Sequence, residues 1–341
     1  MALTFLLCPI KMQGKAVYRI QKKLKVFLTI DTEVWEFYQD IEKNVASGLW
    51  GITEDGEYGL NFQLETFEKY NLKATFFVEP FFSYHSGQKP LETAVNNIQA
   101  SNQEIGLHIH TEWLSGVDVL PFDLDIVHRN IGDFDLPSQV TLIEHARSMI
   151  FNYSDNDVCC FRAGNYGADN NTLKALHEVG ITFDSSYNEP YLNAPCKIIT
   201  DEILTSPKSI YNTIEIPVSH FQDYPTHKRH LQLSACSFSE IKDVLLSNWQ
   251  AEQFSCVIVL HSFEWISRNR KNNTHALDKI CLKRFLKLCK YLADNTDKFE
   301  TLHFKDIDKE EATLFKSSPH IAKSKTLSTI KRFTEQYLRR P

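Results

Sequence analysis

The sequence predicts a single α/β domain, built either as a (β/α) barrel or as a doubly wound parallel sheet. Eight short runs rich in β-branched and aromatic residues recur along the chain, and longer stretches with helical spacing separate them. Several of these runs are apolar at nearly every position, which a strand covered on both faces requires. No break in composition divides residues 20–310, so we expect one folded unit there.

The eight predicted strands follow one another at intervals that leave room for crossover helices. In order they are KVFLTI (25–30), ATFFVEP (74–80), EIGLHIH (104–110), VCCFRAG (158–164), ITFDSS (181–186), TIEIPV (213–218), SCVIVLHSF (255–263) and FETLHF (299–304). Three intervening segments place apolar residues three and four apart, as amphipathic helices do: 59–73, 138–154 and 171–180. We expect an N-terminal extension over 1–23, the α/β unit over 24–310 and a C-terminal tail over 311–341.

Composition limits the classes of function. Of the 341 residues, 43% are hydrophobic and 23% are charged, which is ordinary for a folded, water-soluble protein. The formal net charge of −6 offers no overall positive field for nucleic-acid phosphates, so we expect no binding to DNA or RNA. Eight scattered cysteines, without a CxxC pair, indicate a reduced compartment. Without a signal-peptide pattern or an apolar run of about 18 residues, the chain is expected to be cytoplasmic.

The C-terminal tail differs from the rest of the chain in its charge. From residue 314 onward it carries seven basic residues and one acid, Glu335. If the tail forms a helix, this basic helix could lie on an anionic membrane surface or against a partner. We favour a helix that packs on its own barrel and leaves a charged face in solvent. Five apolar residues would line one face of this helix: Leu327, Ile330, Phe333, Tyr337 and Leu338.

Polar residues gather where the predicted strands end. In parallel α/β folds the reacting groups lie at the carboxyl ends of the strands, where side chains from separate strands meet. Five such coincidences in one chain favour a functional site over chance. The residues at these ends are Asp31 and Glu33, then His108, His110 and Glu112, then Arg162, then Asp184, and finally His261 and Glu264.

Two strand ends carry pairs of residues two positions apart, Asp31 with Glu33 and His108 with His110. Residues i and i+2 of a strand point to the same face, so each pair can face one pocket. Two imidazoles with one or two carboxylates form a divalent-metal set that leaves positions open for water and substrate. Zinc is the first candidate, and iron, cobalt or manganese also suit these ligands. Buried histidines whose nitrogens bond to the backbone are the alternative.

Two other strand ends offer partners for this site. Arg162 follows an apolar run, where an unpaired guanidinium would be costly, so we expect it to pair with Asp31. This pair either serves the site or merely ties two strands together. His261 ends the most apolar strand and is either a core histidine or a general acid that faces the metal. Three tryptophans trail these sites and either line a sugar-binding pocket or pack in the core: Trp35, Trp113 and Trp265.

Five motifs that contain these residues follow one another along the chain. They are TIDTE (29–33), ATFFV (74–78), EIGLHIHTEW (104–113), FRAGNYGADNNTLKALHEVGITFDSSY (161–187) and VIVLHSF (257–263). This series resembles the polysaccharide deacetylase family, the NodB-homology carbohydrate esterases, over about residues 24–305. The resemblance implies a distorted (β/α) barrel and the metal-dependent hydrolysis of N-acetyl or O-acetyl groups on sugars.

The resemblance also implies a role for each site residue. The family's base corresponds to Asp31, with Arg162 to orient it, and its general acid corresponds to His261. Its divalent metal would be held by Glu33, His108 and His110. We expect substrate contacts from Trp35, Trp113, Tyr166, Asp184 and Trp265.

Departures from the family's pattern leave part of this assignment open. Thr32 stands where the usual motif has a second aspartate, and the acid Glu33 follows one residue later. Glu112 stands where the usual second histidine would be, so either His110 or Glu112 completes the metal set. The turn after Arg162 reads RAGNYG and lacks the prolines of the family's RPPYG-like turn.

The expected reaction is hydrolysis of an acetyl group. A bound metal would lower the pKa of a water molecule to about 7 and polarise the acetyl carbonyl. Asp31 would take the proton of the water, a backbone N–H near Tyr166 would help to hold the oxyanion, and His261 would protonate the departing amine. A cytoplasmic location favours nucleotide- or lipid-linked intermediates of surface polysaccharide or glycoconjugate assembly as substrates. A related amidase or deformylase, and a catalytically silent glycan-binding barrel, are the alternatives.

Overall fold

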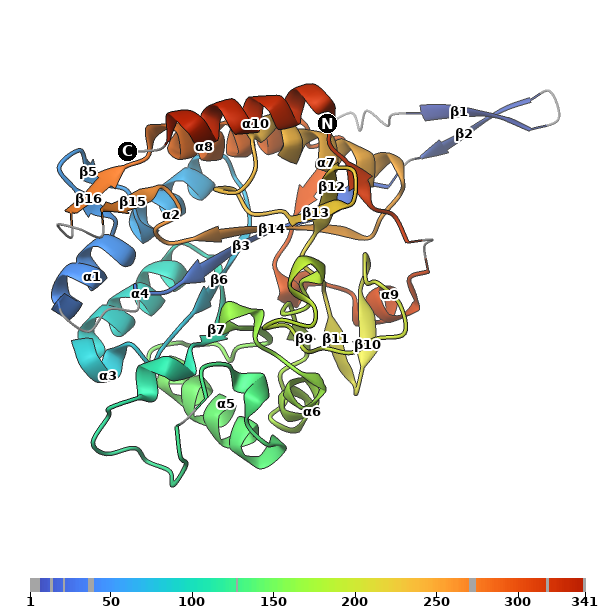
Figure 1. Ribbon diagram of the computed structural model, residues 1–341. Helices are drawn as coiled ribbons and strands as arrows, with labels where there is room; N and C mark the ends of the chain where they lie inside the picture. The colour runs from blue at the N-terminus through green and yellow to red at the C-terminus, as the bar shows by residue number, and fades with distance from the viewer. Residues whose placement is uncertain are drawn as a thin grey trace.

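A curled sheet of nine strands forms the centre of the computed structural model, which describes residues 7–12, 15–20, 22–35, 40–126, 128–269, 274–316 and 319–339 (Figure 1). Eight strands follow the order β10-β11-β9-β8-β7-β6-β3-β14, and β17 pairs with β3. All of these pairings are parallel except that of β10 with β11. The strands are β3 (Leu24–Thr32), β6 (Ala74–Val78), β7 (Glu104–Ile109), β8 (Cys160–Ala163), β9 (Phe183–Asp184), β10 (Lys208–Ile210), β11 (Thr213–Glu215), β14 (Ser255–His261) and β17 (Phe299–Thr301).

All eight predicted strands are present in this sheet, and the predicted α/β class with a distorted barrel is confirmed. The apolar character of these runs follows from their position, because helices cover one face and the barrel interior covers the other. The outer edge of β14 is partly covered by residues 231–233. Their backbone exchanges hydrogen bonds with Val259, from the Val259 N–H to the Leu231 carbonyl and from the Leu233 N–H to the Val259 carbonyl.

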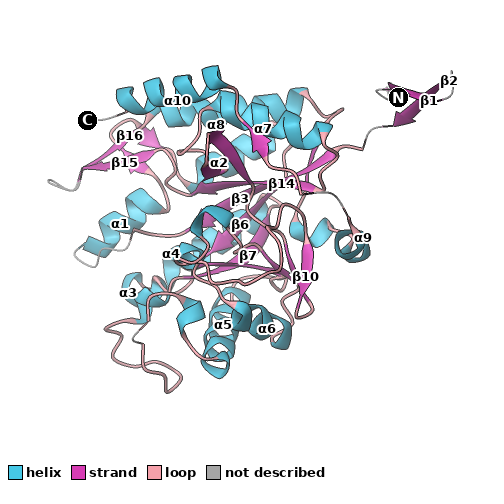
Figure 2. Cartoon of the chain, turned by 45° about the vertical axis from the view of Figure 1, so that its right-hand side comes forward, coloured by secondary structure: helices cyan, strands magenta, loops and turns pink. Residues whose placement is uncertain are grey.

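Helices cover the outside of the curled sheet, with α5 and α6 below it and α7, α8 and α10 above it in Figures 1 and 2. Three of them correspond to the predicted segments: α2 (Leu60–Lys69), α5 (Leu136–Phe151) and α6 (Asn170–Glu178). Among the described helices, none has both the length and the apolar character needed to cross a bilayer. The others are α1 (Ile41–Gly48), α3 (Ser83–Ser86), α4 (Gln88–Ala100), α7 (Phe238–Gln250), α8 (Lys279–Asp294), α9 (Lys309–Leu314) and α10 (Thr326–Leu338).

Short strands form separate small sheets outside the barrel. Three antiparallel pairs are β1 (Leu7–Met12) with β2 (Lys15–Ile20), β4 (Ile52–Thr53) with β5 (Gly56–Glu57), and β15 (Ile266–Asn269) with β16 (Thr274–Leu277). A fourth sheet consists of β12 (His220–Tyr224), β13 (His227–His230) and β18 (Ala322–Lys323). This last sheet connects the C-terminal tail to the segment that runs beside β14.

Two apolar clusters lie on the two faces of the sheet. The larger cluster fills the space between strands and helices and includes Phe76, Phe161 and Leu288. The smaller cluster includes Phe27 and Phe77. Because residues two apart on a strand share a face, Phe27 lies on the same face of β3 as the site residue at position 31. This aromatic layer therefore forms the floor of the barrel interior beneath the strand ends.

The tail forms a helix, α10, but its orientation differs from the expected one. We expected a charged face in solvent, whereas the five apolar residues of the tail are exposed and the buried residues of the helix are Ser328, Thr329 and Arg332. The helix packs on α7 and β12 through this polar face. Hydrogen bonds and ion pairs, rather than apolar burial, hold it in place.

Candidate functional site

Strand register brings the predicted site residues to one level. β14 pairs with β3 so that His261 lies opposite Asp31, and β7 pairs with β8 so that His108 lies opposite Arg162. The strands are parallel, so these residues share the carboxyl end of the barrel. The Nε2 atom of His261 lies 3.9 Å from Asp31 Oδ2 and 3.8 Å from Glu33 Oε1. Residues far apart in the sequence thus meet around one point.

Arg162 is fully buried and pairs with Asp31, as expected. Its Nη1 donates to Asp31 Oδ1 at 2.7 Å and to Thr29 Oγ1 at 2.9 Å. Its Nε and Nη2 donate to the carbonyl and the hydroxyl of Ser185 at 3.0 and 3.1 Å, and its guanidinium lies 4.5 Å from the Phe77 ring centroid. A buried guanidinium with this many partners is rigidly held. Asp31 consequently has one oxygen bound to Arg162 and the other turned toward His261.

Glu33, His108 and His110 form a group that could hold a metal ion. Their candidate ligand atoms lie within 4.8 Å of one another. Glu33 Oε2 lies 3.3 Å from His108 Nε2 and 2.7 Å from His110 Nε2. The Nδ1 atom of His108 donates to the Arg162 carbonyl at 2.8 Å, which leaves its Nε2 as the ligand atom.

Glu112 contacts the other side of the His110 ring. Its Oε1 atom lies 3.0 Å from His110 Nδ1, whereas the Nε2 atom of His110 faces Glu33. Burial disfavours a charged ring, but the charges and hydrogen bonds of Glu33 and Glu112 outweigh it and raise the pKa of His110 well above its usual value. Of the two residues left open by the sequence, His110 therefore belongs to the candidate metal group, and Glu112 orients it.

His261 is held by Glu264, three residues later. The Glu264 carboxylate accepts from the His261 Nδ1–H at 2.8 Å and from the backbone N–H groups of His261 and Ser234 at 3.0 and 2.6 Å. Burial lowers the pKa of the His261 ring, but the hydrogen bond and charge of Glu264, with Glu33 and Asp31, raise it to about 9. At neutral pH the ring is therefore protonated, and its Nε2–H faces Asp31 and Glu33.

Sequence reasoning missed Glu79, which follows β6. It is fully buried, and its two oxygens accept the backbone N–H groups of Phe81 and Phe82 at 2.9 Å each. Burial raises its pKa to about 8, although the charge of His110 acts in the opposite direction. The signal was present in the sequence, since Glu79 directly follows the apolar run ATFFV.

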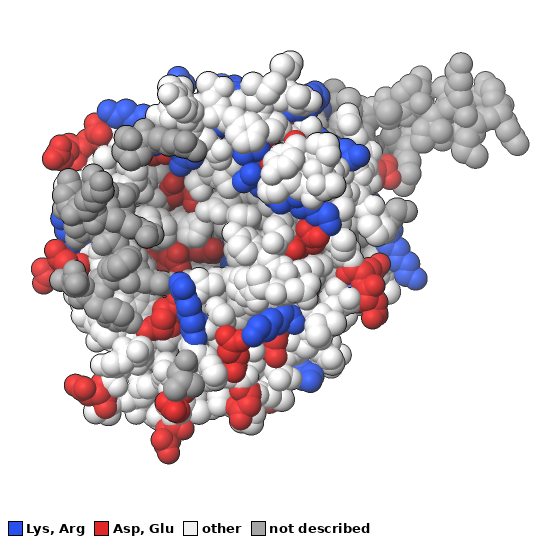
Figure 3. Space-filling view, in the orientation of Figure 1, with Lys and Arg blue, Asp and Glu red and all other residues white. Residues whose placement is uncertain are grey.

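Two adjoining clefts open at this end of the barrel. One has a volume of about 340 Å³ and reaches from Asp31 to Tyr166 and Tyr191. The other, of about 400 Å³, reaches toward Trp35 and Phe263. Both are lined by Glu33, His110, Gln232 and His261, so together they form one groove with these residues at its middle. Figure 3 shows acidic atoms recessed in a hollow on this face of the molecule.

The aromatic residues predicted to contact substrate divide into two kinds. Trp35 lines the groove and stacks on Phe263 with 3.8 Å between ring centroids, and Tyr166 lines it and stacks on Tyr191 at 5.5 Å. Trp113 and Trp265 are fully buried, so the expectation that they contact substrate was wrong. Trp265 donates its indole N–H to the Tyr58 carbonyl, and both rings fill the core, the alternative left open by the sequence.

Asp184 does not face the groove. It is fully buried, accepts the Ser186 hydroxyl at 2.6 Å and lies opposite Glu215 in the pairing of β9 with β11. Burial raises the pKa of both carboxyl groups, and the charge of Asp184 raises that of Glu215 further. Burial therefore favours the protonated form of each carboxyl group, and the expected substrate contact of Asp184 is absent from the described groove.

The turn RAGNYG brings the end of β8 against the metal-ligand candidates. A Cβ atom on Gly164 would lie 2.5 Å from the Ile109 carbonyl oxygen and 2.8 Å from the His110 ring. The next two residues, Asn165 and Tyr166, have φ angles of 56° and 58°, which are uncommon for residues with side chains. Such strained backbone is concentrated at functional sites.

A second cluster of potential ligands lies at the opposite end of the strands. Glu104, Cys159 and Cys160 have candidate ligand atoms within 4.8 Å of one another. The Glu104 carboxylate, however, accepts the hydroxyl of Thr75 at 2.6 Å and the backbone N–H groups of Phe304 and Lys305 at 2.6 and 2.8 Å. These contacts fasten β7 to the segment after β17, so the cluster has a structural role.

Comparisons with known proteins relate the chain by structure. It matches no protein-family model, and no curated protein matches it. A protein of Mycobacterium smegmatis, described as a proposed polysaccharide deacetylase, has a similar structure with a TM-score of 0.53 at 12% identity, over 93% of this chain and all of that one. A family 4 carbohydrate esterase from Streptomyces lividans gives 0.42 at 9% identity, over 87% and 98% of the two chains. A family 4 pseudoenzyme from Bacillus anthracis gives 0.43 at 13% identity, over 83% and 65%.

The likeness to the Mycobacterium smegmatis protein spans nearly the whole of both chains. At this identity it shows the fold, which is the distorted barrel that the motif series implies. The resemblance to polysaccharide deacetylases is thus confirmed at the level of the fold.

Proposed function

We propose that this chain is a metal-dependent hydrolase that removes an N-acetyl or O-acetyl group from a sugar. One observation carries the proposal: Asp31 with Arg162, the group of Glu33, His108 and His110, and His261 with Glu264 surround a single groove. The fold, which polysaccharide deacetylases share, supports it.

The residues present fit a divalent metal, with zinc as our first choice. Both imidazoles offer Nε2 toward Glu33, because the Arg162 carbonyl and Glu112 bind their Nδ1 atoms. Two nitrogen ligands and one oxygen ligand leave a position open for water or substrate. When bound, such a metal polarises a carbonyl oxygen and makes a bound water more acidic.

The chain's own residues supply the proton transfers. Arg162 holds one oxygen of the Asp31 carboxylate, so the other is free to take the proton of the attacking water. A bond forms between the water oxygen and the acetyl carbon, and the bond from that carbon to the sugar nitrogen or oxygen breaks. His261, protonated and held by Glu264, gives its proton to the departing atom. Positioned proton transfers of this kind contribute about 10²- to 10⁴-fold each.

The groove favours a substrate larger than one sugar. Clefts extend from the site in two directions, and each carries an aromatic stack suited to the apolar faces of sugar rings. We propose that the substrate is an intermediate of surface polysaccharide or glycoconjugate assembly. A cytoplasmic location is part of this proposal, since the seven cysteines from Cys159 to Cys289 are free thiols. We further assign the activity to residues 24–310, with 1–23 and 311–341 as additions.

The test combines metal analysis with product analysis on the purified full chain. We expect about one equivalent of zinc or another divalent metal, and acetate release from a panel of acetylated amino sugars and oligosaccharides. Removal of the metal with a chelator should stop acetate release, and added zinc should restore it. Release of formate without acetate would instead identify a deformylase. Metal-free protein that binds the glycans without releasing acetate would identify a silent binding barrel and overturn the proposal.

A further inference from the structure

Helix α10 has the reverse of the usual amphipathic arrangement. A helix on the surface of a globular protein ordinarily buries an apolar stripe and exposes polar residues. In α10, the residues that face the barrel are polar or charged, while five large apolar side chains point outward. The outward side chains are 52% to 79% exposed: Leu327, Ile330, Phe333, Tyr337 and Leu338.

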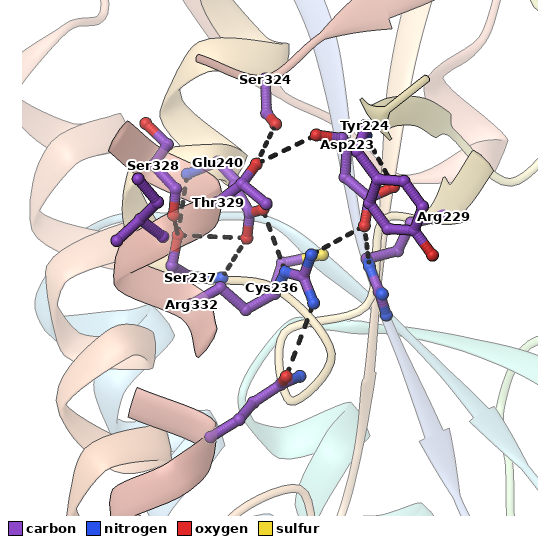
Figure 4. Close-up of polar contacts among 12 residues, drawn as sticks. Asp223, Tyr224, Arg229, Cys236, Ser237, Glu240, Ser324, Ser328, Thr329 and Arg332 are labelled. Atoms are coloured by element: carbon purple, nitrogen blue, oxygen red, sulfur yellow. Dashed lines mark hydrogen bonds and ion pairs between the residues drawn. The ribbon is translucent and has the colours of Figure 1, made fainter. Parts of the chain in front are cut away.

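The inner face of α10 is locked by buried ion pairs (Figure 4). The Arg332 guanidinium donates to Asp223 Oδ2 at 2.7 Å and to Glu240 Oε1 at 3.0 Å, and all three side chains are almost completely buried. The Ser328 hydroxyl donates to Asp243 at 2.6 Å, and the Ser237 hydroxyl donates to the Ser328 carbonyl at 3.0 Å. Removing a partner from such a network is strongly destabilising, so the orientation of the helix is well determined.

Lysines lie beside the five outward apolar side chains of α10, which together form an apolar ridge. A groove of about 680 Å³ runs beside α10, between α7 and α8. Two aspartates in it are already paired, Asp243 with Ser328 and Lys325, and Asp294 with Lys290. The lysines that line the groove are Lys242, Lys287, Lys290, Lys325 and Lys331.

We propose that the outer face of α10, with the adjoining lysine-lined groove, is the surface by which the protein binds an anionic phospholipid membrane. The five apolar side chains enter the boundary between headgroups and acyl chains, and the lysines contact lipid phosphates. Figure 3 shows uncharged side chains projecting between basic groups along the upper edge of the molecule, where Figure 1 places α10. No membrane-spanning segment is required for this mode of binding.

Charge decides between a membrane and a second copy of the chain. Packing α10 against itself across a two-fold axis would bring the lysine-lined grooves of two molecules toward each other, and like charges at short range repel. An anionic bilayer instead attracts each lysine near its surface. The combination of an apolar ridge with flanking lysines is the pattern of helices that lie in the membrane interface.

The C-terminal end of α10 adjoins the rim of the active-site groove. Arg339 donates to the Ser234 carbonyl at 2.6 Å, as does Arg284 of α8 at 3.1 Å, and Ser234 lines the groove. A membrane bound at α10 therefore lies beside the groove. If the proposed function holds, this position suits a sugar that is attached to a membrane lipid.

The test is co-sedimentation of the full chain with vesicles, which needs neither substrate nor metal. We expect sedimentation with vesicles of phosphatidylserine and phosphatidylcholine, and little with phosphatidylcholine alone. Replacing two outward residues together, Leu327→Ser with Ile330→Ser, should weaken binding roughly tenfold or more. Replacing Lys287→Gln or Lys331→Gln should weaken it by roughly fivefold each.

Matched controls separate membrane binding from general surface effects. Phe151→Ser on α5 removes an equally exposed apolar residue from another side of the barrel, and Lys89→Gln on α4 removes an exposed lysine; both should bind as the unmodified chain does. The variants should keep the thermal midpoint of the unmodified chain, because the replaced apolar side chains point into solvent. Three results overturn the proposal: no sedimentation with anionic vesicles, unchanged binding by the α10 variants, or a dimer that dissociates on Ile330→Ser.

Discussion

At the carboxyl end of the barrel strands, Glu33 contacts the Nε2 atoms of two histidines in the groove, whereas at the amino end Glu104 lies beside two cysteines. In each cluster two residues are buried and one is partly buried, and both clusters place ligand-type atoms within 4.8 Å of one another. The oxygens of Glu104 accept hydrogen bonds from a hydroxyl and two backbone N–H groups, so they are committed to holding the fold. Proximity of ligand atoms therefore does not make a site; the difference lies in which partners the carboxylate already has.

The largest difference between the two ends should appear in turnover. Asp31→Asn and His261→Ala each remove a group that we propose to transfer a proton, so we expect acetate release to fall by about 10²- to 10⁴-fold in each. Circular dichroism and thermal unfolding should show that both variants fold. A rate within a few fold of that of the unmodified chain, in either variant, would contradict the roles proposed for these residues.

The second-largest difference between the two ends of the barrel strands should appear in metal affinity. Glu112→Gln keeps an acceptor for His110 but removes the negative charge, so we expect metal affinity to fall about 10- to 100-fold. Cys159→Ser is the matched change at the amino end and should leave affinity unaltered. Competition titration with a chromophoric chelator measures both. Equal weakening by the two variants would mean that the metal sits elsewhere.

At the amino end, Glu104→Gln should lower stability and leave activity unchanged, which is the opposite of what we expect at the carboxyl end. An amide group cannot accept all the hydrogen bonds that the Glu104 carboxylate accepts, so we expect the free energy of unfolding to fall by about 1 to 3 kcal/mol. The activity of the folded protein should stay unchanged. Urea unfolding monitored by tryptophan fluorescence tests this, with Glu300→Gln, an exposed acid on β17, as the control. A loss of activity at full stability would assign chemistry to the amino end.

The smallest effect concerns the neighbouring carboxyl groups of Asp184 and Glu215, which belong to neither cluster. Burial raises both pKa values, so above about pH 4.5 the folded state keeps a proton that the unfolded chain has released. Stability should therefore fall as pH rises through this window, by about 1.4 kcal/mol for each unit that separates the folded and unfolded pKa values.

Glu215→Gln should remove much of this pH dependence, because an amide can donate to an ionised Asp184 without titrating. Urea unfolding at several pH values between 5 and 8 measures the slope, and Glu178→Gln, an exposed acid on α6, should leave it as it is. If Glu215→Gln retains the full slope, the titrating group lies elsewhere.

The sheet could be predicted almost completely from the sequence. Its strands are buried on both faces, so their apolar runs are visible without any knowledge of partners. The pair β12 and β13 was not predicted, because its sequence HFQDYPTHKRH is polar on both faces and is stabilised by charged side chains such as Asp223 and Arg229. Such a hairpin leaves no hydrophobic period to detect.

The candidate site was also partly predictable from the sequence. Spacing by two residues predicted that Asp31 and Glu33 share one face and that His108 and His110 share another, because that spacing fixes a common face of a strand. Spacing could not decide between His110 and Glu112, since the answer depends on which ring nitrogen points inward. Nor could composition distinguish Trp35 at the groove from Trp113 in the core, because the burial of a ring depends on neighbours that are distant in sequence.

Gly164 limits how this barrel can be re-engineered. The carbonyl of Ile109 and the imidazole of His110 occupy the space that any β-carbon at this position would need. Libraries that diversify the RAGNYG loop to change substrate preference should therefore keep this glycine constant and vary the aromatic positions across the groove, Tyr166 and Tyr191, whose rings face open volume. A single methyl group at position 164 would push the imidazole away from Glu33 and disrupt the candidate metal group before any new preference could be selected.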